Sequence, residues 1–314
     1  LPLALALAVR TITKMNSPDY GMFVTTPNEG RIFPNPASGV ITSSHLDVFE
    51  FMGRLLGKAL YESTLVEPQF AAFFLNKLLG RPNYVDDLRS LDVDLHGQLL
   101  SITQLPDVSD LALTFSFLED RFGVQHVVEL APGGAEVDVD NANRHRYIAA
   151  MAFHYLHTRI ASQSRAFRRG LNKMVPVRWI RMFSQGEFQR LIGGASDSFD
   201  IDDMKRHCKY GSGYHPSQPY IQGFWEVVAS FTPAQRAKLL RFTTSCSRPP
   251  LLGFKKLYPP FCVQKLTIQS DSDRLPIAAT CYNLLKLPLY SSVEVMREKL
   301  LLAIEEGAEG FGLS

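Results

Sequence analysis

The chain has 314 residues, of which 46% are hydrophobic and 20% charged, and its formal net charge at neutral pH is +2. This length allows two domains and a substantial core, whereas the small net charge leaves no footprint for a polyanion, so a nucleic-acid partner is not expected. The opening LPLALALAV is apolar but lacks a basic n-region and is too short to span a bilayer, so no membrane partner is expected.

Residues 1–110 are predicted to be mostly helical. We expect the first helix to run to about Met15. Apolar residues at three-and-four spacing predict a helix over residues 49–60, and a similar pattern predicts another over residues 70–79, before the Gly80-Arg81-Pro82 break. The chain starts with leucine, so we also expect a fragment or a divergent start.

Two glycines interrupt the helix predicted over residues 49–60. Gly53 and Gly57 are four residues apart, and because glycine costs about 1 kcal/mol in a helix interior, close packing against another helix is expected there. Glu50 and Lys58 in the same segment are interpreted as surface residues or members of a buried pair rather than as catalysts.

From Leu111 the pattern changes to short β segments, which predict a small α/β subdomain. The strands are expected at LALTFSF (residues 111–117) and QHVVEL (residues 125–130), with a turn at Pro132-Gly133-Gly134 and a further short strand near Val137.

A helix is predicted to follow this subdomain, with Asn141 as its N-cap and Ser162 near its end. Tyr147 and Met151 lie four residues apart on the flank of its apolar stripe, so they are expected side by side outside the core. Without further information a core role would be the simpler reading. A basic cluster follows, and we interpret it as the solvated face of a helix: Arg165, Arg168, Arg169 and Lys173.

The segment IGGASDSFDID (residues 192–202) is the best candidate for a linker. An ordinary helix end followed by a loop is the alternative. Its small and turn-forming residues are Gly193, Gly194, Ala195, Ser196, Asp197 and Ser198. Helices are then expected over residues 200–209 and 220–230, and a third is expected after Thr232, its N-cap, with Pro233 at the first position.

Cys281 lies in RLPIAATCYNLLKLPLYSS, after a stretch of small residues that begins at Pro276. The thiol is therefore expected on a loop, followed by a short strand from Tyr282 to Leu287 that Pro288 ends. An accessible thiol in this place suits acyl transfer between thioesters. A small buried hydrophobe is the alternative reading of a lone cysteine.

The other cysteines, at 208, 246 and 262, form no CxxC pair with Cys281 or with one another. Neither a zinc site nor a disulfide framework is predicted, which is typical of a reducing compartment. We therefore expect a cytoplasmic or nuclear location.

The segment around Cys281, the following amphipathic helix (residues 293–306) and the terminal GFGLS resemble the end of the HECT-type ubiquitin ligase domain. The RPPLLGF and PPFC segments (residues 248–254 and 259–262) are most similar to the IQ-motif-containing branch of that family. Other matching segments follow in the family's order: residues 49–62, 113–123, 139–148, 166–171 and 224–257.

The resemblance implies an α+β, bilobal fold with the lobes joined by a flexible hinge. A mainly helical N-lobe is expected over residues 1–194, with the subdomain that binds the conjugating enzyme at about 110–165. The hinge is expected at 195–198 with Gly193 and Gly194 beside it, and a smaller α/β C-lobe over residues 199–314.

The resemblance also implies a function, in which Cys281 accepts ubiquitin as a thioester from a ubiquitin-charged conjugating enzyme and passes it to a lysine of a protein substrate. Thr280 is expected to support the thiol, and Phe311, fourth from the end, to be needed for transfer to lysine. Leu99, Tyr147 and Met151 are implied as partner-binding residues. No cofactor or metal is implied.

One position departs from the family pattern, because many HECT ligases carry a histidine two residues before the cysteine and this chain has Ala279 there. No general base is therefore assigned. Two alternatives stay open: a non-catalytic adaptor of the ubiquitin pathway that kept the fold, and a cysteine hydrolase. The hydrolase would need a histidine partner, and His207 and His215 are interpreted as ordinary surface or turn residues.

Overall fold

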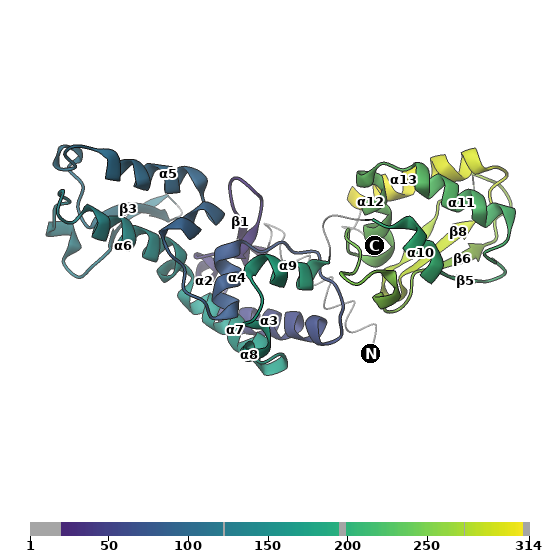
Figure 1. Ribbon diagram of the computed structural model, residues 1–314, viewed down its shortest axis with the longest axis horizontal. Coiled ribbons are helices and arrows are strands. Elements are labelled where there is room, and N and C mark those ends of the chain that lie inside the picture. The colour runs from purple at the N-terminus through teal and green to yellow at the C-terminus, as the bar shows by residue number, and fades with distance from the viewer. Residues whose placement is uncertain (1–19, 122, 195–198, 273, 310–314) are drawn as a thin grey trace. The chain divides into compact units, whose positions relative to one another are not determined.

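The computed structural model of the protein describes residues 20–121, 123–194, 199–272 and 274–309 (Figure 1). These residues form two compact units. The N-terminal unit comprises residues 20–57 and 69–188, and the C-terminal unit comprises residues 58–68 and 189–309. Residues 58–68 and 189–194 thus group with the unit that holds Cys281. The predicted first helix and the predicted hinge at 195–198 lie outside the described residues.

The N-terminal unit combines two short hairpins with α-helices and 3-10 helices. Its strands are β1 (Phe23–Thr25), β2 (Ile32–Pro34), β3 (Ser116–Arg121) and β4 (Val124–Glu129). Its α-helices are α2 (Ser38–Ile41), α3 (His45–Tyr61), α4 (Ala72–Leu79), α5 (Val93–Ser101), α6 (Arg144–Leu156), α7 (Ala161–Met174), α8 (Val177–Ile180) and α9 (Gln185–Gly193), of which α3 and α9 continue into the C-terminal unit. Its 3-10 helices are η2 (Val85–Ser90), η3 (Ile102–Gln104), η4 (Ser109–Leu111), η5 (Gly134–Glu136) and η6 (Thr158–Ile160).

The predicted helices over residues 49–60 and 70–79 are observed as α3 and α4, but the β1–β2 hairpin was not expected. Each of its strands has only three residues, which is too short for an alternating pattern to show. The hairpin is held by antiparallel pairing from Phe23↔Pro34 to Thr25↔Ile32.

Phenylalanine rings form the centre of the N-terminal unit. Phe167 on α7 packs against Phe74, Phe70 and Phe23, with ring centroids 5.5, 6.2 and 6.4 Å apart. Phe23 in turn meets Phe49 edge to face at 5.4 Å. Since each such pair adds about 0.5–1.5 kcal/mol to the burial of its rings, this cluster ties α3, α4 and α7 to the β1–β2 hairpin.

Close packing of α3 on α7 explains the glycines that interrupt α3. A Cβ added to Gly53 would lie 2.0 Å from the carbonyl oxygen of Phe167, and one added to Gly170 would lie 1.9 Å from that of Glu50. The two backbones therefore approach more closely than any side chain allows, as the sequence predicted for Gly53.

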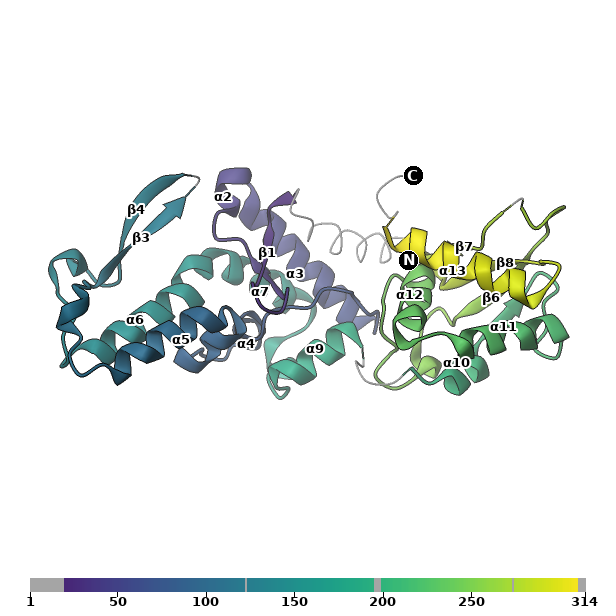
Figure 2. The same cartoon turned by 90° about the horizontal axis from the view of Figure 1, so that it is seen from above.

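The β3–β4 hairpin belongs to a small subdomain with α5 and α6 (Figure 2). Its antiparallel register runs from Ser116↔Glu129 to Arg121↔Val124, so the first strand begins later than predicted. Near Val137 no strand forms; an isolated bridge joins Thr114 to Asp138.

The helix predicted from Asn141 to Ser162 is observed as α6, which ends at Leu156, and the 3-10 helix η6, before α7 begins at Ala161. The predicted N-cap is wrong, because the cap position is Asn143 and the side chain of Asn141 accepts a hydrogen bond from the N–H of Val108 instead. Asparagine suits both roles, and only the packing of the preceding loop distinguishes them.

The C-terminal unit is built on a four-stranded sheet in the order β5-β6-β8-β7, with α-helices packed around it (Figure 1). Pairing is parallel from β5 to β6 and from β6 to β8, and antiparallel between β8 and β7. The strands are β5 (Lys209–Gly211), β6 (Cys262–Leu266), β7 (Ile277–Ala279) and β8 (Leu284–Pro288). The α-helices are α10 (Ile201–His207), α11 (Pro219–Ser230), α12 (Pro233–Thr244) and α13 (Val293–Glu309), and the 3-10 helices are η7 (Phe254–Lys256) and η8 (Thr280–Tyr282).

The predicted start of α12 is confirmed. The Thr232 hydroxyl accepts a hydrogen bond from the N–H of Gln235, the Gln235 side chain accepts one from the N–H of Thr232, and Pro233 occupies the first turn. No helix in the described part of the chain is long and apolar enough to cross a membrane.

Glu50 on α3 is the centre of the largest charge cluster in the N-terminal unit. Its carboxylate accepts hydrogen bonds from Arg54 (2.8 Å), Arg169 (2.5 Å) and Lys173 (2.5 Å). The hydrogen bonds from Lys173, Arg54 and Arg169 lower the pKa of Glu50 from 4.5 to about 2. The expected buried-pair role of Glu50 is therefore confirmed.

The Glu50 cluster predicts a pH-dependent contribution to stability. Replacing Glu50 with Gln should lower the free energy of unfolding at neutral pH. Because the pKa of Glu50 is lower in the folded than in the unfolded state, its contribution is fully present above 4.5 and is lost as the pH falls toward about 2. Urea unfolding of both proteins across this range should therefore give curves that converge at low pH. The control is Glu226→Gln, an exposed carboxylate; a difference that persists at pH 2 would contradict the prediction.

Candidate active site around Cys281

Cys281 lies in η8, the single turn that joins β7 to β8. Because β8 runs parallel to β6 and antiparallel to β7, this turn is at the edge of the sheet where β6 begins. The thiol is half-buried and unpaired with any other cysteine. The sequence-predicted turn before a short strand is thus observed, although Tyr282 belongs to the turn and the strand begins at Leu284.

Asn283 fixes the shape of this turn. Its backbone has a left-handed conformation with φ of 49°, which asparagine tolerates better than most residues. Its N–H donates to the carbonyl of Thr280 (3.3 Å), its carbonyl accepts from the N–H of Cys262 (2.9 Å), and its side-chain amide donates to the carbonyl of Pro259 (2.6 Å). The Cys281 turn is therefore tied to the segment that leads into β6.

Thr280, Cys281 and Asn283 line one side of a pocket of about 370 Å³ in the C-terminal unit. Residues of α12 and of the segment after it line another side, among them Ser245, Cys246 and Arg248. The lining also includes Glu62 to Leu65, from the end of α3 and the residues that follow it. The thiol therefore borders a concave surface rather than a flat one.

The other three cysteines lie in environments that disfavour the thiolate. Burial raises the pKa of Cys208 and of Cys246 to about 12, and it also raises the pKa of Cys262. Since the thiolate is the nucleophile, these thiols are poor candidates for catalysis.

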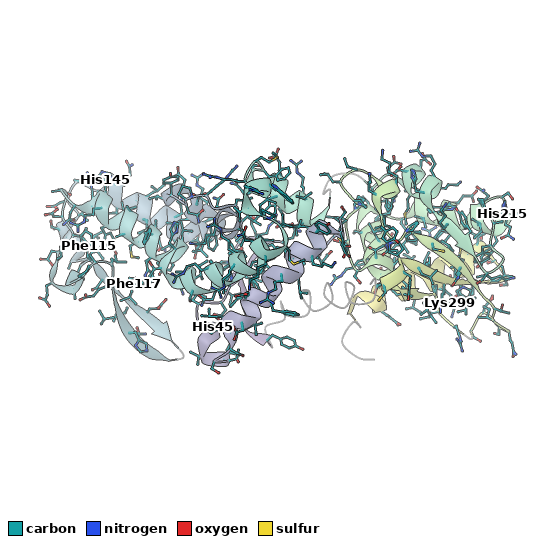
Figure 3. The ribbon with its side chains drawn as sticks, turned by 90° about the horizontal axis from the view of Figure 1, so that it is seen from below. His45, Phe115, Phe117, His145, His215 and Lys299 are labelled. Atoms are coloured by element: carbon teal, nitrogen blue, oxygen red, sulfur yellow. The ribbon has the colours of Figure 1, made fainter. Side chains whose placement is uncertain are left out.

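The histidines of the C-terminal unit are engaged away from Cys281. The Nδ1 atom of His207 lies 3.1 Å from a carboxylate oxygen of Asp203, and Nδ1 of His215 lies 2.9 Å from the hydroxyl of Ser217. Figure 3 labels His215, which lies in the turn that leads into α11. No histidine is among the residues that line the Cys281 pocket, so the described residues do not assemble the thiol–imidazole pair that a cysteine hydrolase needs.

Two of the predicted hinge residues, Gly193 and Gly194, are described, and both are buried. The carbonyl of Gly193, the last residue of α9, faces the Cys246 thiol at 3.7 Å. Gly194 has φ of +85°, and a Cβ there would lie 2.4 Å from the carbonyl oxygen of Pro249. Ala195, Ser196 and Asp197 lie outside the described residues, as does Phe311, so the hinge and the role of the tail stay predictions.

The expectation that Tyr147 and Met151 stand outside the core is wrong. Their side chains on α6 are 5% and 6% exposed, and Leu99 on α5 is 4% exposed. Tyr147 packs edge to face on Phe115 at 5.6 Å, and Phe117 meets His154 in the same way; Figure 3 labels Phe115 and Phe117. The ring of Phe115, the residue before β3, therefore covers Tyr147, which the periodicity of α6 alone could not reveal.

Two exposed apolar residues of the same subdomain were missed. Leu118 and Val127 are 65% and 63% exposed and lie opposite each other on the β3–β4 hairpin. Alternation along the strands was the available signal, since Leu118 and Val127 fall on the face opposite Phe117. Asn283 was also missed, although an asparagine two residues after a turn cysteine is a recognisable sign of a left-handed position.

Comparison with known proteins places this geometry in a family. The model of the HECT-domain (ubiquitin-transferase) family matches residues 9–314. The chain is 44% identical over 94% of its length to E3 ubiquitin-protein ligase UPL6 of Arabidopsis thaliana, and 42% identical over 96% of its length to ubiquitin-protein ligase E3B of Homo sapiens. It is 41% identical over 94% of its length to a probable E3 ubiquitin protein ligase of Schizosaccharomyces pombe. It spans 29%, 31% and 29% of these relatives, respectively.

The Asn283 turn gives a testable prediction about stability. Asn283→Ala should lower the free energy of unfolding by about 2–3 kcal/mol, because alanine resists the left-handed conformation and the hydrogen bond to the Pro259 carbonyl is lost. Asn283→Gly, which adopts this conformation freely, should lose about 1 kcal/mol less. Urea unfolding measures both values; an alanine variant as stable as the parent would show that the turn does not depend on Asn283.

Proposed function

Because the chain belongs to the HECT-domain (ubiquitin-transferase) family, we propose that Cys281 accepts ubiquitin as a thioester from a conjugating enzyme and passes it to a substrate lysine. The observation that carries this proposal is the half-buried Cys281 thiol on the η8 turn, at the edge of a pocket, in a C-terminal unit where burial raises the pKa of the other three thiols.

The chemistry consists of two acyl transfers. In the first, the Cys281 thiolate attacks the carbonyl carbon of the incoming thioester, a new carbon–sulfur bond forms, and the thiolate of the conjugating enzyme leaves. In the second, a lysine amine attacks the Cys281 thioester, an amide bond forms, the amine loses a proton and the Cys281 thiolate leaves. The first step exchanges one thioester for another, and the second converts a thioester to an amide. Neither step therefore needs a cofactor.

Accessibility decides which thiol can take part. The attacking and leaving sulfurs must come within bonding distance of one carbonyl carbon, so the acceptor must be reachable by a second protein. Cys281 lies in a single turn, whereas Cys208 and Cys246 are buried at 7% and 3% exposure. Thr280, whose carbonyl closes the turn, helps to present the thiol.

We propose that the β3–β4 hairpin supplies part of the surface that recruits the conjugating enzyme. Leu118 and Val127 form an exposed apolar cross-strand pair in the subdomain that the family resemblance assigns to this partner. Apolar side chains that are this exposed on a small hairpin are candidates for anchors in a protein interface. The buried Tyr147, Met151 and Leu99 would then stabilise the subdomain rather than contact the partner.

Cys281 substitution tests the acyl-transfer proposal. With a charged conjugating enzyme under single turnover, Cys281→Ala should form no ubiquitin adduct, and Cys281→Ser should form an oxyester that resists thiol reductant, because serine attacks but its ester is a poorer acyl donor. Non-reducing gels measure both. Cys262→Ala is the matched control and should keep its adduct. A reductant-sensitive adduct on Cys281→Ala would rule out this residue, and absence of any adduct on the parent protein would favour the adaptor alternative.

Hairpin and core substitutions should separate binding from folding. Val127→Ala and Leu118→Ala should each weaken binding of the conjugating enzyme by about 1–3 kcal/mol with little change in melting temperature. Tyr147→Ala should instead destabilise the fold by about 3 kcal/mol. Val40→Ala, at a position that is 72% exposed on α2, is the control for Val127→Ala. Titration calorimetry and melting curves give the two quantities; equal affinity of the Val127→Ala, Leu118→Ala and Val40→Ala variants would contradict the hairpin assignment.

If the C-terminal tail positions the reactants for transfer to lysine, substituting Phe311 should slow that second transfer and leave thioester formation nearly unchanged. Phe311→Ala should form the Cys281 thioester within about twofold of the parent rate, yet discharge it to lysine about tenfold more slowly, because only the second step needs the amine positioned. Pulse–chase assays with free lysine and with substrate measure the two rates separately. Leu313→Ala is the control in the same tail. Equal loss of both steps would indicate that Phe311 acts through stability alone.

A further inference from the structure

The basic residues of α7 fall into two pairs with different surroundings. Arg169 and Lys173, four residues apart, turn toward α3 and pair with Glu50. Arg165 and Arg168, three residues apart, line a groove elsewhere in the N-terminal unit. The first pair therefore has a structural partner, and the second needs a different account.

The groove lies where α4 and α6 end and α7 begins, and its volume is about 530 Å³. Four of its lining residues carry a positive charge: Lys77, Arg81, Arg165 and Arg168. Its lining contains no aspartate or glutamate. Two aromatic rings complete one side, since Phe153 stacks on His157 with centroids 4.8 Å apart and planes at 19°.

The four cations have only neutral hydrogen-bond partners among the described residues. Lys77 Nζ lies 3.0 Å from Nδ1 of His157, whose Nε2 lies 3.2 Å from the carbonyl oxygen of Asn83. Because Nε2 must carry a proton to donate to that oxygen, Nδ1 is the atom that accepts from the Lys77 ammonium group. The charge of Lys77 is therefore not neutralised by its partner.

Two of the arginines also donate only to neutral groups. Arg165 donates to the carbonyl of Ala161 and Arg81 to that of Arg181. The guanidinium of Arg168 lies over Gly80, with Nη2 2.8 Å from the position that a Cβ would occupy. No ion pair within the described parts of the chain includes any of the four cations.

Partial burial makes the charge of Lys77 costly, whereas Arg165 and Arg168 are exposed to solvent. This burial lowers the pKa of Lys77 to about 8, and burial together with the neighbouring Lys77 lowers the pKa of His157. A bound anion would offset this cost, because it would pair with a cation that is already partly removed from water.

We propose that this groove binds a phosphorylated serine or threonine side chain of a partner protein, with an apolar residue of the same segment resting on Phe153. A phosphate carries a charge of about −1.5 to −2, and its oxygens match the planar fork of arginine, so it suits converging cations better than one carboxylate does. Phe153 is 60% exposed at the rim and offers the apolar contact. The site is independent of the thioester chemistry of Cys281.

A peptide fits the groove better than a polynucleotide does. Nucleic acids are bound by stripes of positive charge that follow the backbone over many phosphates. On α7 the side chains of Arg169 and Lys173 are directed to Glu50 of α3 and share its carboxylate with Arg54, so they do not join Arg165 and Arg168 in the groove. What remains is a local, concave group of cations beside a ring.

The experiment uses the whole chain and an array of fluorescein-labelled peptides, each with one phosphoserine or phosphothreonine and varied neighbours, beside an unphosphorylated copy of the array. Fluorescence anisotropy then gives the affinity of the best peptide. The groove variant is Arg165→Gln with Arg168→Gln, and the matched control is Arg178→Gln with Arg297→Gln, two exposed arginines outside the groove. Melting curves check the fold, and Arg165→Gln alone is the second variant, since Arg168 packs on Gly80.

We expect phosphate-dependent binding that the groove variant weakens about tenfold or more and the control leaves within about twofold. Phe153→Ala should remove the preference for an apolar neighbour. The proposal is overturned if no peptide binds better with its phosphate, or if the groove and control variants weaken binding equally. It is also overturned if only anionic vesicles or single-stranded RNA, tested in parallel, depend on Arg165 and Arg168.

Discussion

The geometry of the candidate active site depends on one residue held in a left-handed conformation. Asn283 reverses the chain directly after Cys281, and its amide and carbonyl connect the turn to Pro259 and Cys262. The start of β6, the start of β8 and the thiol turn are therefore one hydrogen-bonded corner. Sheet pairing then carries this constraint to the rest of the C-terminal unit, because β6 lies between β5 and β8. A thiol in a single turn keeps its access to solvent only if such a corner holds the turn out of the core.

The four cysteines differ in how deeply their thiols are buried, and the residues next to them in the sequence do not reveal this difference. Cys208 precedes β5 and Cys246 follows α12, and both are closed in by the C-terminal unit, so ionising either would place a charge where water cannot reach it. Cys281 is part of the wall of a pocket instead. The same unit therefore holds two buried thiols, the half-buried Cys262 thiol with a raised pKa, and the Cys281 thiol at a pocket that no histidine lines. In acyl exchange between thiols, an accessible and well-oriented acceptor is more important than a dedicated base of the kind that peptide hydrolysis needs.

Charge in the N-terminal unit is organised around α7. Glu50 of α3 pairs with Arg54, Arg169 and Lys173, and this cluster joins the helices that carry the phenylalanine core. Arg165 and Arg168 instead line a groove with Lys77 and Arg81, and no carboxylate lines that groove. The same helix therefore combines a structural ion-pair cluster with a surface that is suited to an anion. The small net charge of the chain conceals this local separation.

The sequence alone determined the features that depend on neighbouring residues. Spacing located α3 and α4, the capping pattern located the start of α12, the glycines of α3 indicated close helix packing, and small residues between Pro276 and a short apolar run located the Cys281 turn. The resemblance to the HECT family gave the α+β class and the family, and the comparisons confirmed both. Tertiary structure decided which partner covers each face. Tyr147 and Met151 are buried, Tyr147 against the ring of Phe115, and the Asn141 side chain accepts a hydrogen bond from Val108 rather than capping a helix. Arg169 pairs with Glu50, which is 119 residues away in the sequence, whereas Arg165 does not pair with it. Periodicity reports which side of an element is apolar or charged, but the contacts that bury or neutralise that side come from residues far apart in the chain, and these are fixed only when the elements pack.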